Sequence, residues 1–228
     1  MGFGRVTLVA VAMLTTGLGL SGCLDLVQTV GVDRTGAGHY QVAVTGEGIV
    51  GDAIKNEKLV NRQNHATLTT ADINGRVTRT ANVDFKSLSE LAFSDETMSM
   101  AVKSRDFFGL GPSHVAFTAN VMVNKAKSEN PETATAGDLG EKVAQGILGD
   151  HTYVFSVTVP GDVERADPIV AGGESYAPTI TGDFWNGHTV TWRMPLAALV
   201  TSPQLSFEVD FSAIGFFKDS KSQLVANN

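Results

Sequence analysis

Apolar residues recur at every second position along much of this chain, and that period limits the folds open to it. In the longest run, apolar residues stand at positions 115, 117, 119, 121 and 123. Alternation with a period of two indicates a β-strand with one buried face. Comparable runs occur at 25–33, 39–46, 77–85, 98–102, 153–159, 190–194 and 205–211. The chain is therefore expected to fold mainly as β-sheet.

Turn signals between these runs favour antiparallel pairing. Asn74-Gly75 is a strong signal for a two-residue hairpin turn, and the segment from Arg34 to Gly38 joins the first two strands. Helical periodicity is limited to Ile49–Asn64 and Asp138–Leu148, with a single short turn expected at Ser87–Phe93. We therefore expect an α+β domain, in which a mainly antiparallel β-sheet has about two helices packed on one face.

The first 22 residues have the composition of an export signal. Arg5 is the only basic residue before an apolar run that extends from Val6 to Leu20. This run is shorter than the ~20 apolar residues that cross a bilayer, and threonine and glycine interrupt it. A basic start, a short apolar centre and small residues at the end are typical of a secretory signal peptide. Residues 1–22 are therefore predicted to be removed.

The apolar run ends in Leu20-Ser21-Gly22-Cys23, which resembles the lipobox of bacterial lipoproteins at every position. The resemblance implies that the Cys23 thiol takes a diacylglyceryl group, while small residues at 21 and 22 admit the peptidase. Two or more acyl chains, such as palmitate, anchor a protein stably. We expect a lipid-anchored protein on the extracytoplasmic side of a bacterial cell envelope. Residue 24 is leucine rather than aspartate, which favours the outer membrane if the organism is Gram-negative.

The mature chain is acidic and has one cysteine. The signal contains one basic and no acidic residue, so its removal takes the formal net charge from −7 to −8. This charge disfavours binding to nucleic acid or to anionic headgroups. Because Cys23 is the only cysteine, no intrachain disulfide forms and the fold depends on its hydrophobic core. We divide the mature chain into a single α+β domain over 23–212 and a tail over 213–228.

The segment from Gly46 to Gly51 reads G-x-G-x-x-G between a strand and a helix, which is the pattern of a dinucleotide site. The preceding strand is expected in a hairpin, and the next strand, 66–72, is rich in threonine. A central parallel strand would instead be apolar throughout. Glu47 would also face the pyrophosphate. We therefore interpret the glycines as easing the turn from strand to helix.

The sequence has no catalytic or metal-binding signature. Histidines 39, 65, 114, 151 and 188 lack the spacing of a zinc site. Asp162, Glu164 and Asp167 alternate, but the glycine of a calcium loop is missing, so a solvated strand edge is the preferred interpretation. There is no G-x-S-x-G pattern, and nothing orients Ser175 as a nucleophile. We expect no enzymatic activity, cofactor or metal.

Two predicted loops carry large apolar side chains. Phe107, Phe108 and Leu110 lie in an expected hairpin connection, and Phe216 and Phe217 follow the last strand. Loops are normally polar, so exposed apolar clusters here would indicate a surface that contacts a ligand or a membrane. The alternative is that both groups fold under the sheet as core.

The order of elements resembles the LppM-like lipoprotein domain of mycobacteria and other bacteria. The acylated cysteine leads straight into a hairpin with a helix after it, and Phe85–Leu88 ends a later hairpin. Val159–Gly161, followed by Ala166-Asp167, and then Thr191–Leu196 complete the resemblance. Many members continue into a C-terminal membrane helix, whereas this chain ends in polar residues 218–228. The resemblance implies an envelope protein that contacts lipids without known catalysis, and it supplies no functional residues.

These observations predict a membrane-anchored envelope lipoprotein that acts as a non-catalytic binding module for a lipid or other amphiphile. The alternative is a structural or protein-interaction subunit of an envelope assembly. An apolar cavity would favour the binding module, and a flat apolar patch would favour the subunit. The expected partners are a membrane, through the lipid anchor, and an amphiphile or an envelope protein. Nucleic acid is not expected as a partner.

Overall fold

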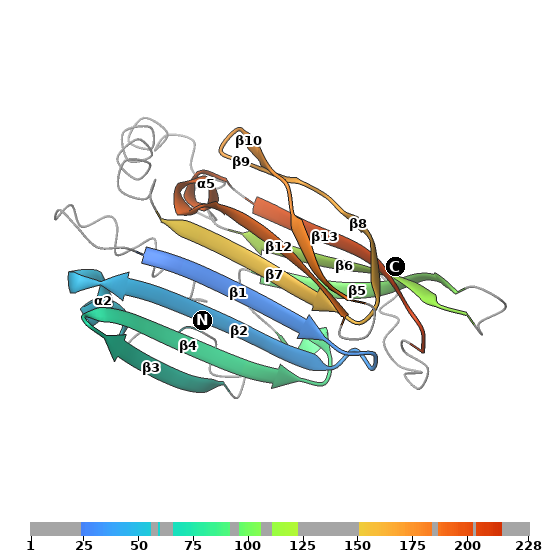
Figure 1. The fold of residues 1–228 in the computed structure, drawn as a ribbon, viewed down its shortest axis with the longest axis horizontal. Helices are drawn as coiled ribbons and strands as arrows, with labels where there is room; N and C mark the ends of the chain where they lie inside the picture. Colours follow the sequence, from blue (N-terminus) through green and yellow to red (C-terminus); the bar gives the residue numbers. More distant parts are fainter. Residues whose placement is uncertain are drawn as a thin grey trace, which may run out of the picture.

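The computed structural model describes residues 24–55, 59, 66–91, 96–105, 111–122, 151–183, 187–202 and 204–215. Most of these residues lie in the strands of two sheets, with short helices between them (Figure 1). This arrangement agrees with the predicted α+β class. The signal segment, both apolar groups of the predicted loops and the helix predicted at 138–148 lie outside the described residues.

The larger sheet has seven strands in the order β11-β12-β7-β1-β2-β4-β3. They are β1 (Leu24–Val32), β2 (Gly38–Glu47), β3 (Thr67–Ile73), β4 (Arg76–Phe85), β7 (Thr152–Val159), β11 (Thr179–Asp183) and β12 (Gly187–Pro195). β1 and β7 pair in parallel, and the other described pairs in this sheet are antiparallel. The sheet is therefore mixed at its centre and antiparallel on both sides.

The turn between β3 and β4 follows the prediction from the sequence. Asn74 and Gly75 have φ angles of 55° and 82°. A type I′ turn requires positive φ at both central residues, which explains the choice of asparagine and glycine. Asn74 is the only residue other than glycine with positive φ in the described part of the chain.

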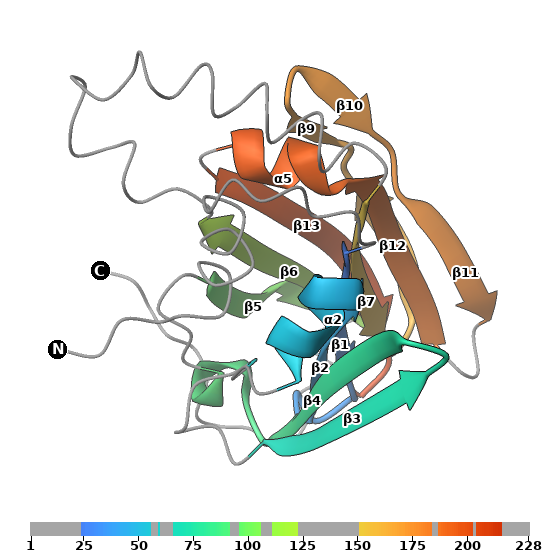
Figure 2. The same ribbon diagram turned by 90° about the vertical axis from the view of Figure 1, so that its left-hand side faces the viewer.

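The smaller sheet has four strands in the order β5-β6-β13-β8, and neighbouring strands pair antiparallel. They are β5 (Glu96–Arg105), β6 (Ser113–Met122), β8 (Asp162–Ala166) and β13 (Gln204–Ala213). A separate hairpin consists of β9 (Ile169–Ala171) and β10 (Glu174–Tyr176). Figure 2 shows β5, β6 and β13 as a second layer beside the larger sheet.

The two layers pack around aromatic rings. Phe207 of β13 stacks on Phe155 of β7 with ring centroids 4.1 Å apart, and Trp192 of β12 meets Phe207 edge-on at 5.4 Å. All three side chains are fully buried. Such offset and edge-to-face pairs add to the free energy gained from burying apolar area. Along β13, buried and solvent-facing residues alternate from Leu205 to Ala213, as the period of two predicts.

Two α-helices occur in the described residues, α2 (Gly48–Ile54) and α5 (Leu196–Thr201), together with the 3-10 turn η2 (Leu88–Glu90). α2 occupies the beginning of the helix predicted at 49–64, and η2 lies within the short turn predicted at 87–93. α5 was not predicted. In the part of the chain that is described, no helix is both long and apolar enough to cross a membrane.

The expected packing of two helices on one face of the sheet is not confirmed. α2 follows the end of β2 and α5 follows the end of β12, and both strands end where β1 and β7 begin. Figure 2 looks onto this end of the molecule, with both helices near the viewer. The two helices therefore lie at one end of the strands.

The glycines of the G-x-G-x-x-G segment allow α2 to fold back onto β2. A Cβ atom on Gly51 would lie 2.9 Å from the carbonyl oxygen of Gly46, which is too close. Gly48 has a φ of 58°, a conformation that glycine adopts without strain. β2 pairs antiparallel with both β1 and β4, unlike the strand of a dinucleotide site. The topology agrees with our interpretation of these glycines as a feature of packing.

Candidate functional site

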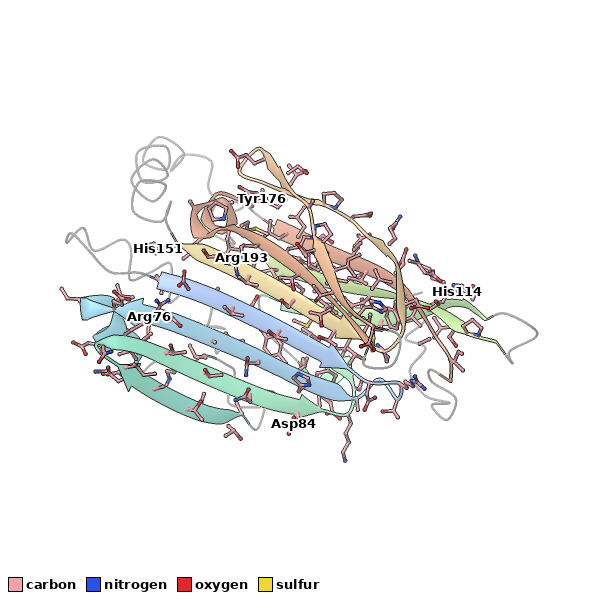
Figure 3. The ribbon with its side chains drawn as sticks, in the orientation of Figure 1. Arg76, Asp84, His114, His151, Tyr176 and Arg193 are labelled. Atoms are coloured by element: carbon pink, nitrogen blue, oxygen red, sulfur yellow. The ribbon has the colours of Figure 1, made fainter. Side chains whose placement is uncertain are left out.

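The start of β1 locates the predicted lipid attachment point. Leu24 is the first residue of β1 and is bonded directly to Cys23. Consecutive Cα atoms are about 3.8 Å apart, so Leu24 determines where Cys23 leaves the domain. We call this region the N-terminal end; it comprises the starts of β1 and β7, the end of β2, α2 and the β3–β4 turn. In Figure 3, Arg76 and His151 are labelled at this end, and His114 and Asp84 at the opposite end.

Leu24 is held by a buried hydrogen bond to a distant residue. Its backbone N–H donates to Nδ1 of His151 over 2.9 Å, and the two residues are 7% and 8% exposed. The carbonyl oxygen of His151 accepts a hydrogen bond of 2.7 Å from the N–H of Leu196, the first residue of α5. Because Nδ1 acts as an acceptor here, this geometry requires the neutral imidazole with its proton on Nε2.

Asp25 connects the same point to two further strands. Its Oδ1 accepts a hydrogen bond of 3.1 Å from the N–H of Thr152, which begins β7. Its Oδ2 forms an ion pair of 3.0 Å with Arg76, which begins β4, and Arg76 also lies 3.9 Å from Glu47. The two residues that follow Cys23 are thus joined to β7 and, across β2, to β4.

Lys55 joins the end of α2 to the edge of the sheet. Its Nζ lies 3.0 Å from Asp52 of α2 and 3.1 Å from Asp72 of β3. The hydrogen bond to Asp52, followed by that to Asp72, raises the pKa of Lys55 above its usual value. Exposed pairs of this kind contribute little to stability, but they orient α2 against the β3–β4 hairpin.

Two strongly exposed apolar side chains lie at the N-terminal end. Ile49 in the first turn of α2 and Ile73 at the end of β3 are each 70% exposed. Ile214, just beyond β13, is 59% exposed and lies at the opposite end. These isoleucines are exposed at the ends of elements, where packing in the core does not account for them.

A second group of polar side chains lies inside the core. Gln28 of β1 is 2% exposed, and its Nε2 donates a hydrogen bond of 3.1 Å to the hydroxyl of Tyr40. The Tyr153 hydroxyl donates to Oε1 of the same amide. Buried polar groups that satisfy one another in this way specify packing. Amide and phenol groups also supply no acid or base near neutral pH, so we assign this cluster a structural role.

Three of the described histidines, His114, His151 and His188, each contact a different partner. Nδ1 of His114 is 2.6 Å from Oε1 of Glu164, and Nδ1 of His188 is 2.7 Å from the carbonyl oxygen of Gly161. Nδ1 of His151 receives the N–H of Leu24, as described above. Among the described residues, no three histidine, cysteine, aspartate or glutamate side chains are grouped to hold a metal ion.

The acidic side chains of the predicted strand edge also diverge. Asp162 lies 3.9 Å from His188, and Asp167 lies 3.4 Å from Arg165, while Glu164 meets His114. β8, which carries Asp162 and Glu164, is one of the two outer strands of the smaller sheet and is largely exposed. This arrangement agrees with the interpretation of a solvated strand edge.

Every residue that the sequence predicted for the site lies outside the described residues. These are the lipobox residues Leu20, Ser21, Gly22 and Cys23 and the apolar residues Phe107, Phe108, Leu110, Phe216 and Phe217. Described residues border these groups at Leu24, Gly111 and Gly215. Ser113, which follows the first apolar group, pairs with Ala213, which precedes the second. The described chain therefore leads into both groups from neighbouring points, at the end opposite to Leu24.

No sequence pattern brings together the residues of the N-terminal end. Leu24 and His151 are 127 positions apart, and Asp25 and Arg76 are 51 apart. The only local signal is Asp25 itself, a carboxylate between Leu24 and Leu26 and two residues after Cys23.

The sequence matches no family model and no curated protein. Among solved structures, the chain is similar to the folded domain of the LppM protein of Mycobacterium tuberculosis, determined by NMR. The TM-score is 0.44 at 11% sequence identity, and the match covers 86% of this chain and 95% of the other.

Proposed function

We propose that this chain is a bacterial lipoprotein whose domain is held on the extracytoplasmic side of an envelope membrane by lipid on Cys23. The observation that carries the proposal is the position of Leu24. This residue follows the lipobox cysteine directly and begins a central strand. Its N–H is bonded to His151, and the carboxylate of the next residue, Asp25, accepts a hydrogen bond from the N–H of Thr152. A lipid on Cys23 would therefore be joined to the rigid centre of the domain without an intervening linker.

We propose further that the anchored domain acts as a non-catalytic binding module for a lipid or other amphiphile. The contact residues would be Phe107, Phe108, Leu110, Phe216 and Phe217. Support comes from the pairing of Ser113 with Ala213, which brings the flanks of both apolar groups together.

The alternative function is a structural or protein-interaction subunit of an envelope assembly. The two outermost strands of the larger sheet favour it. β3 and β11 are exposed at every residue and are rich in threonine. Their outer edges leave backbone groups that a strand of a partner protein can pair with.

Native mass spectrometry of the protein extracted from its own membrane tests both the lipid anchor on Cys23 and the binding of an amphiphile. We expect an intact mass that corresponds to a chain beginning at Cys23 with a diacylglyceryl group, and a co-purifying lipid. Cys23→Ala should abolish acylation, whereas Ser21→Ala keeps a small residue before the cleavage site and should remain acylated. Acyl mass on the Cys23→Ala protein would refute the anchor. A co-purifying protein without lipid would favour the assembly subunit.

A further inference from the structure

We infer that the N-terminal end of the domain, with Ile49 and Ile73 foremost, inserts into the boundary between headgroups and acyl chains of the membrane that carries its anchor. This inference rests on the proposed lipid attachment at Cys23. It adds a second, non-covalent contact between the protein and the bilayer, and it fixes which face of the domain the bilayer covers.

Strand register places both isoleucines beside the attachment point. Leu24 lies opposite Gly46 in β2, and α2 begins two residues after Gly46. Ile73 pairs with Arg76, which itself pairs with the last residue of β2. β3 is three strands away from β1, a lateral distance of about 15 Å at ~4.8 Å per strand. An acyl chain on Cys23 therefore brings the bilayer surface to the same end of the sheet.

The exposure of the two side chains is unusual for their size. Leu68 and Ile180, in the outermost strands of the larger sheet, are 44% and 47% exposed, whereas Ile49 and Ile73 reach 70%. Val170 of β9 is 69% exposed. An apolar side chain that is mostly exposed in water gains free energy when a bilayer covers it. The bilayer to which Cys23 is joined is the partner nearest to Ile49 and Ile73.

The charges at this end point to an apolar contact. Lys55 lies between Asp52 and Asp72, and Arg76 lies between Asp25 and Glu47. The carboxylates thus outnumber these two cations, and anionic headgroups would not be attracted. Insertion should therefore occur on neutral phosphatidylcholine and should depend little on salt.

Single-cysteine labelling of the acylated full-length protein tests the inference. The thiol of the only native cysteine is taken by the lipid, so Ile49→Cys, Ile73→Cys or Ile214→Cys introduces the only free thiol. Each variant is labelled with an environment-sensitive fluorophore in detergent and reconstituted into phosphatidylcholine vesicles. Ile214, 59% exposed at the opposite end, is the matched control.

We expect aqueous iodide to quench the probes at 49 and 73 several-fold less than the probe at 214, and spin-labelled acyl chains to quench them more. If the probes at 49 and 73 are as open to iodide as the probe at 214, the insertion is refuted. Flotation of the vesicles separates this failure from failure of the anchor. If the protein floats with the vesicles but its probes at 49 and 73 remain exposed to water, the insertion alone is refuted. If the protein does not float and lacks acyl mass, both the anchor and the insertion are refuted.

Discussion

The two ends of the strands are closed in different ways. At the N-terminal end, residues far apart in the chain meet: Leu24 with His151, and Asp25 with Arg76. At the opposite end, the β1–β2 turn is closed locally, because the Asp33 carboxylate accepts hydrogen bonds from the N–H and the hydroxyl of Thr35. Contacts between distant segments form only when the whole domain has folded, whereas a local turn needs only its own residues. The contacts of Leu24 and Asp25 thus report on folding of the whole domain, whereas the β1–β2 turn reports only on its own residues.

The same substitution at the two ends should reveal this difference. His151→Ala leaves the N–H of Leu24 without its buried acceptor and removes packed atoms, so we expect a loss of about 2–3 kcal/mol in the free energy of unfolding. His114→Ala, at the opposite end, removes a partly exposed pair with Glu164 and should cost less than ~1 kcal/mol. Urea unfolding of the vesicle-bound protein measures both. Equal losses would remove the distinction between the ends.

Replacing one carboxylate at each end tests the same comparison, with a smaller expected loss of stability. Asp25→Ala removes the acceptor for Thr152 and the partner of Arg76, and we expect a loss of about 1–2 kcal/mol. Asp84→Ala changes an exposed carboxylate at the opposite end of β4 and should stay within ~0.5 kcal/mol of the unmodified protein. Urea midpoints of the two variants, measured side by side, would contradict the account if Asp84→Ala were the more damaging change.

The smallest expected effect concerns Lys55. Hydrogen bonds to Asp52 and Asp72 raise its pKa from the ordinary value of 10.5. The folded state therefore binds the proton of Lys55 more tightly than the unfolded state does. The contribution of Lys55 to stability is complete below its pKa in the unfolded state and is lost as the pH rises through its pKa in the folded state. Lys55→Met should weaken the fall in thermal stability above about pH 10.

Tyr176 titrates in the same direction and provides the control. Burial, followed by its hydrogen bond to Glu174, raises its pKa above 10.0, so its contribution is also lost at high pH. Tyr176→Phe removes the pH dependence of stability that comes from Tyr176 and leaves the pH dependence that comes from Lys55. A pH profile that is unchanged by Lys55→Met in the Tyr176→Phe background would show that the Lys55 pair does not stabilise α2.

Much of the sheet could be predicted because burial on one face leaves a local pattern. The alternation in β13 and the Asn74-Gly75 turn were both interpreted correctly. β9 and β10 have three residues each, too few to show a period, and β11 is exposed on both faces. α5 is six residues long with an apolar sequence, so it has no polar face to mark a helix. These elements depend on tertiary packing that the local pattern does not express.

The candidate site likewise has one part that a local motif predicts and another that depends on tertiary packing. A lipobox is a local motif, and Cys23 could be singled out from its four-residue context. The neighbours of Leu24 could not be predicted, because the parallel pairing of β1 with β7 joins segments more than 120 positions apart. Neither strand's sequence indicates which strand it pairs with. The position of Ile73 beside the attachment point likewise follows only from the register of β2, β4 and β3.

Energy transfer to the bilayer surface measures whether the N-terminal end faces the membrane. Strands of nine or ten residues separate the two ends by about 30 Å. Donor fluorophores at Ile73→Cys or Ile214→Cys of the acylated protein transfer energy to acceptor-labelled headgroups in the outer leaflet. If the N-terminal end faces the membrane, transfer from position 73 will be much stronger than from position 214. Equal transfer, or stronger transfer from 214, would show that this end does not face the membrane.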